Sequence, residues 1–290
     1  MLFDPVFSER CSPFSWLGPK RYTPKPADIE DIPIVDVVII SHCHYDHLDY
    51  PTIMQISKSH PNAHFFCPIG NKQWFEKSGI TKVTELDWWD ERDVNLVESR
   101  PEPTVTETTT SAPSADVAPG KPISGRIGCL PCQHMSARTA FDKGRTLWAS
   151  WSVESGGVKI WFGGDTGYRA VPELPTGEDD YGTGHDYPHC PAFKEIGSHR
   201  GPFDLALIPI GAYEPRYIMS PMHANPFDAV NIFKDVRANR ALAMHHLTWV
   251  LTEEPVLEPS SLLKKALATS GLADTGVFDT CDIGESIEYP

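Results

Sequence analysis

The stretch from Ser41 to Asp49, SHCHYDHLD, constrains this chain more than any other. It follows an apolar, β-branched run from Ile34 to Ile40, which is typical of a fully buried strand. In α/β proteins, the loop that leaves a buried strand is a common place for catalytic residues. Three histidines and an aspartate within six positions of such a loop therefore indicate an α/β fold with its functional site at the end of this strand.

These four side chains are of the types that bind zinc. His42 and His44 are two positions apart, so in extended backbone they project to the same side and can share an ion. Asp46 and His47 follow where the chain must turn, and they can face a second point in the same pocket. Imidazoles combined with a carboxylate suit zinc, and the tight spacing leaves room for two ions. Solvated loop histidines beside a helix-capping aspartate are the alternative interpretation, which this density of ligands disfavours.

Three further candidate ligands also stand where a predicted strand ends. They are His134 after residues 126–133, Asp165 after residues 158–162, and His245 after residues 241–244. The shared placement favours one site, because strand ends of one sheet gather at a common edge. Taken alone, Asp165 could equally cap a turn, and His246 is an alternative to His245.

Composition narrows the partners that the chain can have. The net charge of −14 over 290 residues argues against nucleic acid, because binding phosphates needs clustered Lys and Arg. It also means that contact with an anionic membrane would have to be local and apolar. The seven cysteines show no regular spacing, which favours a reducing compartment over a disulfide framework. Cys129 and Cys132 form a CxxC that we interpret as buried thiols on a strand.

The chain is expected to be one domain, 1–290, with one disordered insertion. Residues from about 97 to 125 are mostly Thr, Ser, Pro, Ala and Glu, and they cannot bury enough surface to fold. Strands and helices alternate around this insertion, and a last helix capped by Ser260 or Ser261 packs an apolar stripe on the core. No run reaches the ~18 apolar residues of a membrane span, and no leader follows Met1. We therefore expect an intracellular protein, cytoplasmic or peripheral on an organelle membrane.

The pattern His-x-His-x-Asp-His resembles that of the metallo-β-lactamase superfamily. Four other segments extend the resemblance to the family of N-acyl-phosphatidylethanolamine-hydrolysing phospholipases D: DPVFSERCSP at 4–13, PCQH at 131–134, GGDTGY at 163–168 and GAYEPR at 211–216. The resemblance implies a four-layer αββα sandwich, α/β in its broad class. The chain looks N-terminally shortened, because strands that this family carries before the opening segment are missing here.

The resemblance also implies a site with two Zn²⁺ ions. One ion would be bound by His42, His44 and His134, the other by Asp46, His47 and His245, with Asp165 as the bridge. The implied catalytic residues are Asp46, Asp165 and His223, and the implied substrate-binding residues are Tyr45, Tyr213, Met222 and His223. Trp16, Trp88 and Met219 are expected in the apolar lining. A hydroxide on the two ions would cleave N-acyl-phosphatidylethanolamine to N-acylethanolamine and phosphatidic acid. The phospholipid would come from a membrane surface, and a homodimer is compatible with this scheme.

Three alternatives remain open at this stage. A lactonase or small-molecule phosphodiesterase of the same superfamily would keep the metals and change the substrate. An inactive zinc-binding remnant is the second, because an incomplete sandwich could fail to hold the ligands in register. The third, a nucleic-acid processing enzyme, is disfavoured by the acidic composition.

Overall fold

The computed structural model describes residues 1–97 and 122–289. Most of the predicted insertion at 97–125 lies outside the described residues. The first of two sheets has the strand order β1-β2-β3-β4, and every pair in it is parallel. Its strands are β1 Leu2–Phe3, β2 Val37–Ile39, β3 His64–Pro68 and β4 Val83–Leu86.

The second sheet is mixed, with the order β11-β10-β9-β8-β7-β6-β5. Its strands are β5 Glu91–Leu96, β6 Ile123–Leu130, β7 Ser150–Ser155, β8 Val158–Phe162, β9 Phe203–Pro209, β10 Ala238–Met244 and β11 Phe278–Asp279. β5 to β8 are antiparallel neighbours, whereas β8 to β11 run parallel. It follows that β6, β8 and β10 point the same way, and their C-terminal ends share one edge of the sheet.

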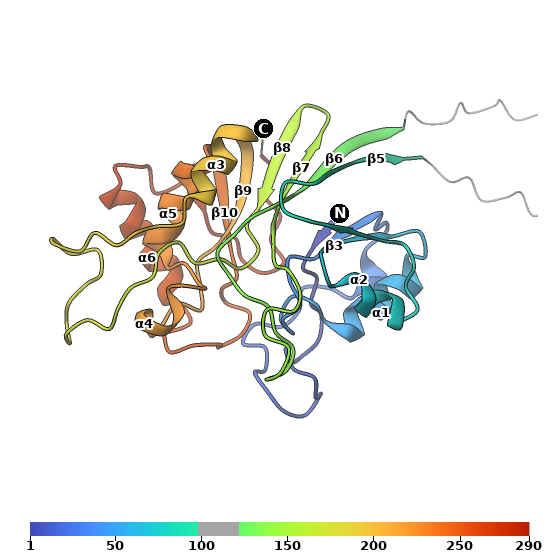
Figure 1. The fold of residues 1–290 in the computed structure, drawn as a ribbon, viewed down its shortest axis with the longest axis horizontal. Coiled ribbons are helices and arrows are strands. Elements are labelled where there is room, and N and C mark those ends of the chain that lie inside the picture. The colour runs from blue at the N-terminus through green and yellow to red at the C-terminus, as the bar shows by residue number, and fades with distance from the viewer. Residues whose placement is uncertain (98–121, 290) are drawn as a thin grey trace, which may run out of the picture.

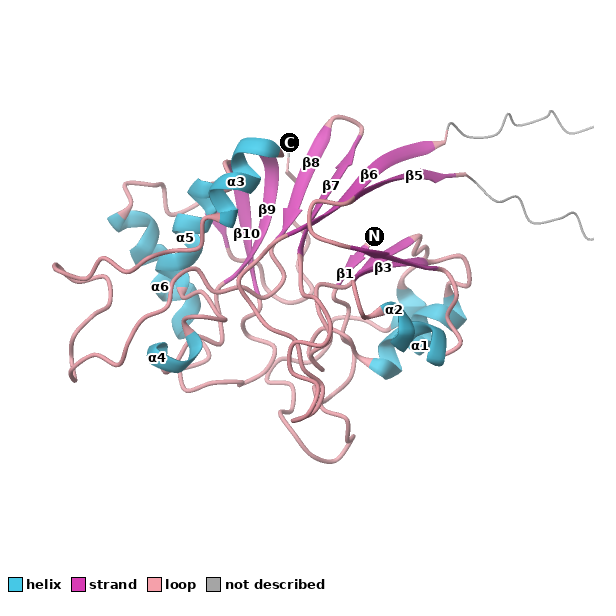
Figure 2. Cartoon of the chain, viewed as in Figure 1, coloured by secondary structure: helices cyan, strands magenta, loops and turns pink. Residues whose placement is uncertain are grey.

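Helices cover the outer face of each sheet (Figures 1 and 2). The helical segments of the described chain are the 3-10 turn η1 Ile29–Asp31 and the helices α1 Tyr50–Ser59, α2 Lys72–Lys77, α3 Ala192–His199, α4 Arg216–Met219, α5 Pro226–Asp235 and α6 Glu258–Thr269. Residues of α1 and α2 share a core cluster with β2 and β3, and residues of α3, α5 and α6 share one with β9 and β10. A third cluster, which includes Ile39 and Trp151, lies between the sheets. The predicted αββα sandwich is confirmed.

Several element boundaries differ from those expected. β6 begins at Ile123, three residues before the predicted start, because Ile123–Gly128 pair with β5 at the edge of the sheet. β5 and α3 were not predicted at all. The last helix begins at Glu258, so Ser260 and Ser261 lie within its first turns and do not cap it. Its Leu263, as predicted, is buried in the core.

Two structural features bear on the other expectations. None of the seven cysteines forms a disulfide in the described chain, and both thiols of the CxxC, Cys129 and Cys132, are buried. Within residues 1–97 and 122–289, no helix has the length and apolarity needed to cross a bilayer.

Candidate metal centre

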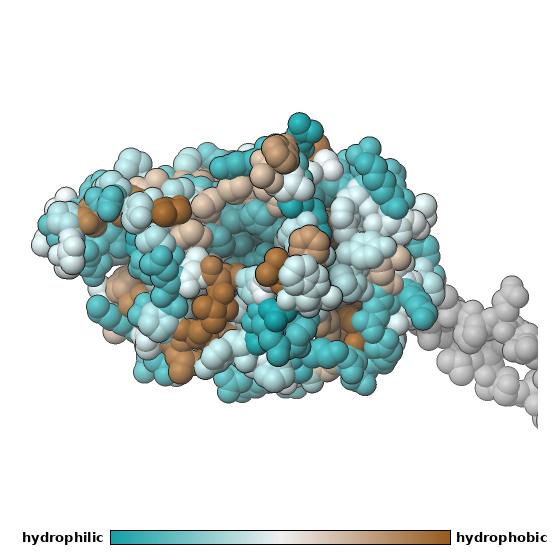
Figure 3. Space-filling model, turned by 90° about the horizontal axis from the view of Figure 1, so that it is seen from below, coloured by the Kyte–Doolittle hydropathy of each residue, from teal (hydrophilic) through white to brown (hydrophobic). Residues whose placement is uncertain are grey.

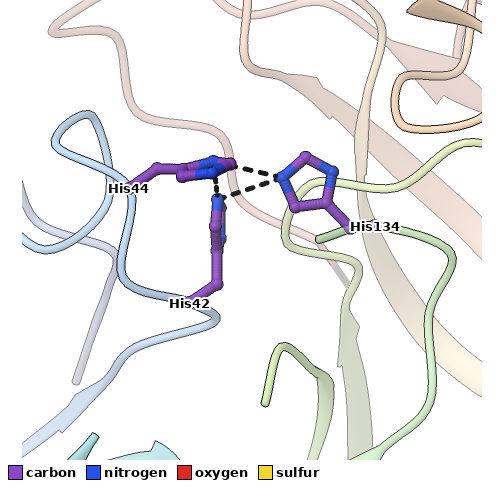
Figure 4. A group of neighbouring side chains, drawn as sticks. All are labelled: His42, His44 and His134. Atoms are coloured by element: carbon purple, nitrogen blue, oxygen red, sulfur yellow. Dashed lines mark hydrogen bonds between the residues drawn. The ribbon is translucent and has the colours of Figure 1, made fainter. Parts of the chain in front are cut away.

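The first group of potential ligands consists of three imidazoles (Figure 4). His42 and His44 come from the loop after β2, and His134 comes from the loop after β6. Nε2 of His42 lies 2.8 Å from Nδ1 of His44 and 3.2 Å from Nε2 of His134, and the latter two are 3.3 Å apart. Nitrogens around one tetrahedral zinc, with Zn–N about 2.0–2.1 Å, are about 3.3 Å apart. The triangle therefore has the size that a shared ion requires.

The second group lies directly beside the first and includes Asp46, His47, Asp165 and His245. Asp165 Oδ2 is 3.0 Å from His47 Nε2, and its Oδ1 is 3.2 Å from His245 Nε2. Asp46 Oδ2 lies 3.4 Å from His245 Nε2 and 3.6 Å from His47 Nε2. The Oδ2 of Asp165 is also 3.9 Å from His134 Nε2. Asp165 thus stands between the two groups, which is the place of a bridging ligand.

The orientation of His245 depends on an unusual backbone. Its φ is 59°, in the left-handed region that residues other than glycine seldom occupy. Its carbonyl approaches Gly211 so closely that a Cβ on residue 211 would lie 2.2 Å from that oxygen. Glycine is therefore required at the start of the GAYEPR segment. His246 belongs to none of the ligand groups within the described residues.

Several potential donor atoms are buried and have no hydrogen-bond partner among the described residues, as expected for atoms that bind a metal ion. Both oxygens of Asp165 and Nε2 of His47 are buried, and none has an aligned hydrogen-bond partner among the described residues. Burying an ionised carboxylate is costly unless it is paired or coordinates a metal. A divalent cation would satisfy all three atoms at once. The residues present therefore fit a pair of metal ions.

The electrostatics of the cluster favour cation binding as well. Burial lowers the pKa of His134 to about 3 and holds that of His42 well below its usual value, so both imidazoles are neutral at pH 7. Burial alone would raise the pKa of Asp165, but His245, His47 and His223 hold it well below its usual value. Burial likewise opposes charge on His47, yet Asp165, Asp46 and Asp4 raise its pKa well above the usual value. A metal ion would replace the proton that His47 carries.

Two supporting residues escaped the sequence analysis. Asp4 Oδ2 lies 2.6 Å from Nδ1 of His47, and its Oδ1 accepts the backbone N–H of Ser41 at 2.7 Å. The Ser41 hydroxyl donates to Asp4 Oδ2 and lies 2.9 Å from Nδ1 of His42. A carboxylate on the second ring nitrogen fixes the tautomer and direction of a ligand histidine. The only sequence signal was that Asp4 opens the DPVFSERCSP segment.

The loop before α5 supports the other side of the site. The carbonyl of Met222 lies 2.8 Å from Nδ1 of His134, which directs Nε2 of that ring toward His42 and His44. His223 is buried, with its ring centroid 5.1 Å from that of His134 and its Nδ1 3.9 Å from Asp165 Oδ2. Met222 thus contacts the site through its backbone, and His223 is placed beside the ligands.

The other residues predicted to bind substrate or line the site make different contacts. Tyr45 is half-buried beneath the guanidinium of Arg138. Tyr213 is buried and donates its hydroxyl to Glu258 of α6, and it lines a separate cavity of about 440 Å³. Trp88 packs on the core between the sheets, and the Trp16 side chain is 72% exposed. Neither contacts the ligand cluster in any described interaction, so both depart from the expected lining.

The surroundings of the cluster are partly apolar. Asp46, His47, Asp165 and His245 form one wall of a cavity of about 330 Å³ whose other walls include Phe3, Phe7, Phe162, Met244 and Trp249. The face seen from below in Figure 3 is hollowed at its centre, with a hydrophilic floor and apolar side chains gathered beside it. Exposed apolar residues between β1 and η1 and on α4 include Phe14, Trp16, Leu17, Tyr217 and Ile218.

Two facing sheets with histidine and aspartate side chains gathered at their strand ends are the arrangement of the metallo-β-lactamase fold, and comparison with known proteins agrees. The profile of the beta-lactamase superfamily domain matches residues 1–246. The isothiocyanate hydrolase from Delia radicum gut bacteria has a similar fold, with a TM-score of 0.59 and 15% identity, over 99% of this chain and 91% of that one.

Two curated relatives are N-acyl-phosphatidylethanolamine-hydrolyzing phospholipases D. Phospholipase D 1 of Caenorhabditis elegans is 37% identical over 97% of this chain and 68% of its own length. The mitochondrial enzyme of Saccharomyces cerevisiae is 31% identical over 94% of this chain, which spans 49% of that relative. The chain therefore belongs to the metallo-β-lactamase superfamily, within the family that includes these phospholipases D.

Proposed function

We propose that this chain is a binuclear zinc phosphodiesterase that cleaves N-acyl-phosphatidylethanolamine to N-acylethanolamine and phosphatidic acid. The observation that carries the proposal is the buried Asp165, which lies between two groups of imidazoles with both of its oxygens unsatisfied by hydrogen bonds from the described residues. The identity of the two phospholipase D relatives supports the substrate class.

The ligands divide into two sets with Asp165 in common. We assign His42, His44 and His134 to the first ion and Asp46, His47 and His245 to the second. Bound divalent ions lower the pKa of a coordinated water and offset the charge of phosphodiester oxygens. The burial of the ligands on packed strand ends keeps the two sets in fixed relative positions, as catalysis by positioning requires.

Other side chains would handle the substrate and the proton. In the reaction, a water oxygen bonds to phosphorus, the bond from phosphorus to the ethanolamine oxygen breaks, and a proton passes to that leaving oxygen. Asp46 is half-buried at the rim of the second set, where its carboxylate can accept a proton from the attacking water. Burial lowers the pKa of His223 to about 4, so this residue is a neutral imidazole that can donate a hydrogen bond to a phosphodiester oxygen. Tyr45 is proposed as a further substrate contact on the same loop.

The apolar surroundings support a lipid substrate. The cavity of about 330 Å³ places aromatic and aliphatic walls directly beside Asp165 and His245. Phe14 and Trp16, two exposed aromatic side chains of the segment before η1, suit contact with a lipid interface. We therefore propose that the substrate is taken from a membrane surface.

The test combines metal analysis with hydrolysis of a labelled N-acyl-phosphatidylethanolamine in detergent micelles. We expect about two zinc ions per wild-type chain, and release of labelled N-acylethanolamine. Asp165→Asn should lose most of the second ion and nearly all activity, because the amide cannot supply a charged bridge. Asp274→Asn, at an exposed position after α6, is the matched control and should resemble wild type.

Two of the alternatives predict results that differ from this one. Turnover of soluble lactones or esters with none of the phospholipid would favour a lactonase or small-molecule phosphodiesterase. Two bound zinc ions without turnover of any phosphodiester would indicate a zinc-binding remnant. A fully active Asp165→Asn variant would rule out the binuclear scheme itself.

A further inference from the structure

Arg138 lies four residues after His134, on the loop that connects β6 with β7. Its Nη1 donates two hydrogen bonds to main-chain carbonyls, to Cys43 at 2.7 Å and to Leu48 at 2.8 Å. These carbonyls bracket the part of the histidine loop that contains His44, Asp46 and His47. A single guanidinium nitrogen therefore closes both ends of the ligand-bearing turn.

The rest of the guanidinium also packs against this turn. Its central carbon lies 4.0 Å from the centroid of the Tyr45 ring and 5.6 Å from that of Trp74 on α2. A guanidinium over an aromatic face is attracted by the ring quadrupole, and more strongly when the pair is shielded from water. The stacking holds Tyr45 against Arg138, in the middle of the bracketed turn.

Arg138 is itself held in place by its own loop. The Oδ1 atom of Asp142 accepts the backbone N–H of Arg138 at 3.0 Å and that of Thr139 at 2.8 Å. The same loop contacts the histidine loop again through the Thr146 hydroxyl, 3.4 Å from Cys43 Sγ. Arg138 and Thr146 thus connect the loop that contains His134 with the histidine loop after β2.

We propose that Arg138 is a positioning residue that sets the affinity of the second metal ion. The inference rests on the proposed binuclear site. The bracketed turn supplies two ligands of the second set, Asp46 and His47, but only His44 of the first. His42 precedes the turn and is positioned by Ser41 at the end of β2. Loosening the turn should therefore weaken the second ion more than the first.

The test measures stepwise Zn²⁺ binding to the chelator-treated 290-residue chain, by calorimetry in competition with a chromophoric chelator. Arg138→Met keeps the apolar stem and removes the donors. We expect it to weaken the second ion roughly 10- to 100-fold, as loss of an outer support of a metal site typically does. The affinity of the first ion should change much less. Arg145→Met, an exposed arginine of the same loop, is the matched control and should leave both steps as in wild type.

Arg138→Lys separates a positioning role from a merely structural one. One ammonium can donate to both carbonyls, but it lacks the planar face that stacks on Tyr45. We expect Arg138→Lys to bind the second ion more tightly than Arg138→Met does, but more weakly than wild type. The ratio of the first affinity to the second should likewise lie between the ratios of those two proteins. If Arg138→Met does not fold, the lysine variant alone must show a weaker second ion relative to the first.

Three outcomes would overturn the inference. The first is an unchanged ratio of the two affinities in Arg138→Met or, if only that variant folds, in Arg138→Lys. The second is equal weakening of both ions, which would indicate a general loss of structure. The third is a wild-type chain that does not take up two ions, and this result alone would also overturn the proposed function.

Discussion

At the scale of single residues, Asp4 contributes more to the candidate site than its place near the start of the chain suggests. It adopts a φ of 39°, which is uncommon for a residue other than glycine, and its backbone N–H donates to the carbonyl of Ile39 at 2.9 Å. This conformation places its carboxylate against Ser41 and Nδ1 of His47. One side chain thus orients the end of β2 and a proposed ligand of the second ion.

Replacing Asp4 by Asn should therefore impair metal binding without removing a ligand. The amide cannot accept the Nδ1 proton of His47 with the strength of a carboxylate, so we expect a loss of about 10–100-fold in zinc affinity or in turnover. Zinc titration and hydrolysis of N-acyl-phosphatidylethanolamine would measure the two effects. If Asp4→Asn matches the Asp274→Asn control in both measurements, the contact with His47 contributes to neither zinc affinity nor turnover.

Residue identity predicted the members of the ligand groups but not the residues that support them. The imidazoles and carboxylates are recognisable because they are dense in sequence or follow a strand. Asp4 is separated from Ser41 by 37 positions, and Arg138 is separated from Cys43 by 95. No local pattern marks such pairs, because each exists only after the strands have paired and the loops have packed.

At the scale of elements, the N-terminus of α5 connects three segments around the site. The carboxylate of Asp228 is fully buried and accepts from Arg169 at 3.1 Å, from Arg216 at 2.7 Å and from the hydroxyl of Tyr181. Its backbone N–H donates to the side chain of Asn225, which completes a capping box. Arg169 lies shortly after Asp165, and Arg216 begins α4. The network therefore connects the loop that contains Asp165 with the loop that contains Met222 and His223.

Removing this carboxylate should destabilise the whole domain. Asp228→Ala leaves the two buried cations Arg169 and Arg216 with Asp180 as their one remaining carboxylate, and breaking a buried ion pair costs about 3–5 kcal/mol. Urea unfolding monitored by circular dichroism would measure the loss. Asp93→Ala, which breaks an exposed pair with Arg126 on the neighbouring strand, should have little effect. Equal midpoints for the two variants would contradict the expected role of the network.

Apolar patterns marked some of the elements, whereas β5 lacks such a pattern and was missed. The strands over β2 and β8 were recognisable from β-branched and aromatic runs. By contrast β5, with the sequence ERDVNL, is half-exposed or exposed throughout, and its strand conformation depends on pairing with β6. The edge position removes the burial pattern that sequence analysis needs.

At the scale of the whole molecule, the site exists only where the two sheets meet. The first sheet supplies the histidine loop after β2, and the second supplies His134, Asp165 and His245 after β6, β8 and β10. The core cluster between the sheets, which includes Ile39 and Phe162, fixes their relative position. Sequence analysis could expect convergence of strand ends, but it could not derive which strands are neighbours. Because the candidate ligands come from both sheets and meet only in the folded chain, metal binding and folding should be coupled.

The buried imidazoles should make the stability of the metal-free protein depend on pH. Burial lowers the pKa of His134 to about 3, and that of His223 and of His246 to about 4, from the usual 6.5. Below pH 6.5 the unfolded chain takes up protons that these folded imidazoles refuse, so stability falls as the pH is lowered. His47 has the opposite sign, because its raised pKa stabilises the fold at acidic pH and that contribution is lost as the pH rises. The metal-free protein should consequently be most stable near neutral pH.

The prediction concerns chelator-treated protein unfolded in urea at pH 7 and at pH 5. A pKa lowered from 6.5 to about 4 corresponds to roughly 3 kcal/mol at full effect, so a clearly lower midpoint is expected at pH 5. His246→Asn should lose less stability between the two pH values than the wild type, because it removes one of the buried groups that acid must charge. Zinc-loaded protein should show a steeper loss, since protons compete with the ions for the ligand imidazoles. A midpoint that stays constant or rises from pH 7 to pH 5 would mean that the buried imidazoles do not govern acid stability.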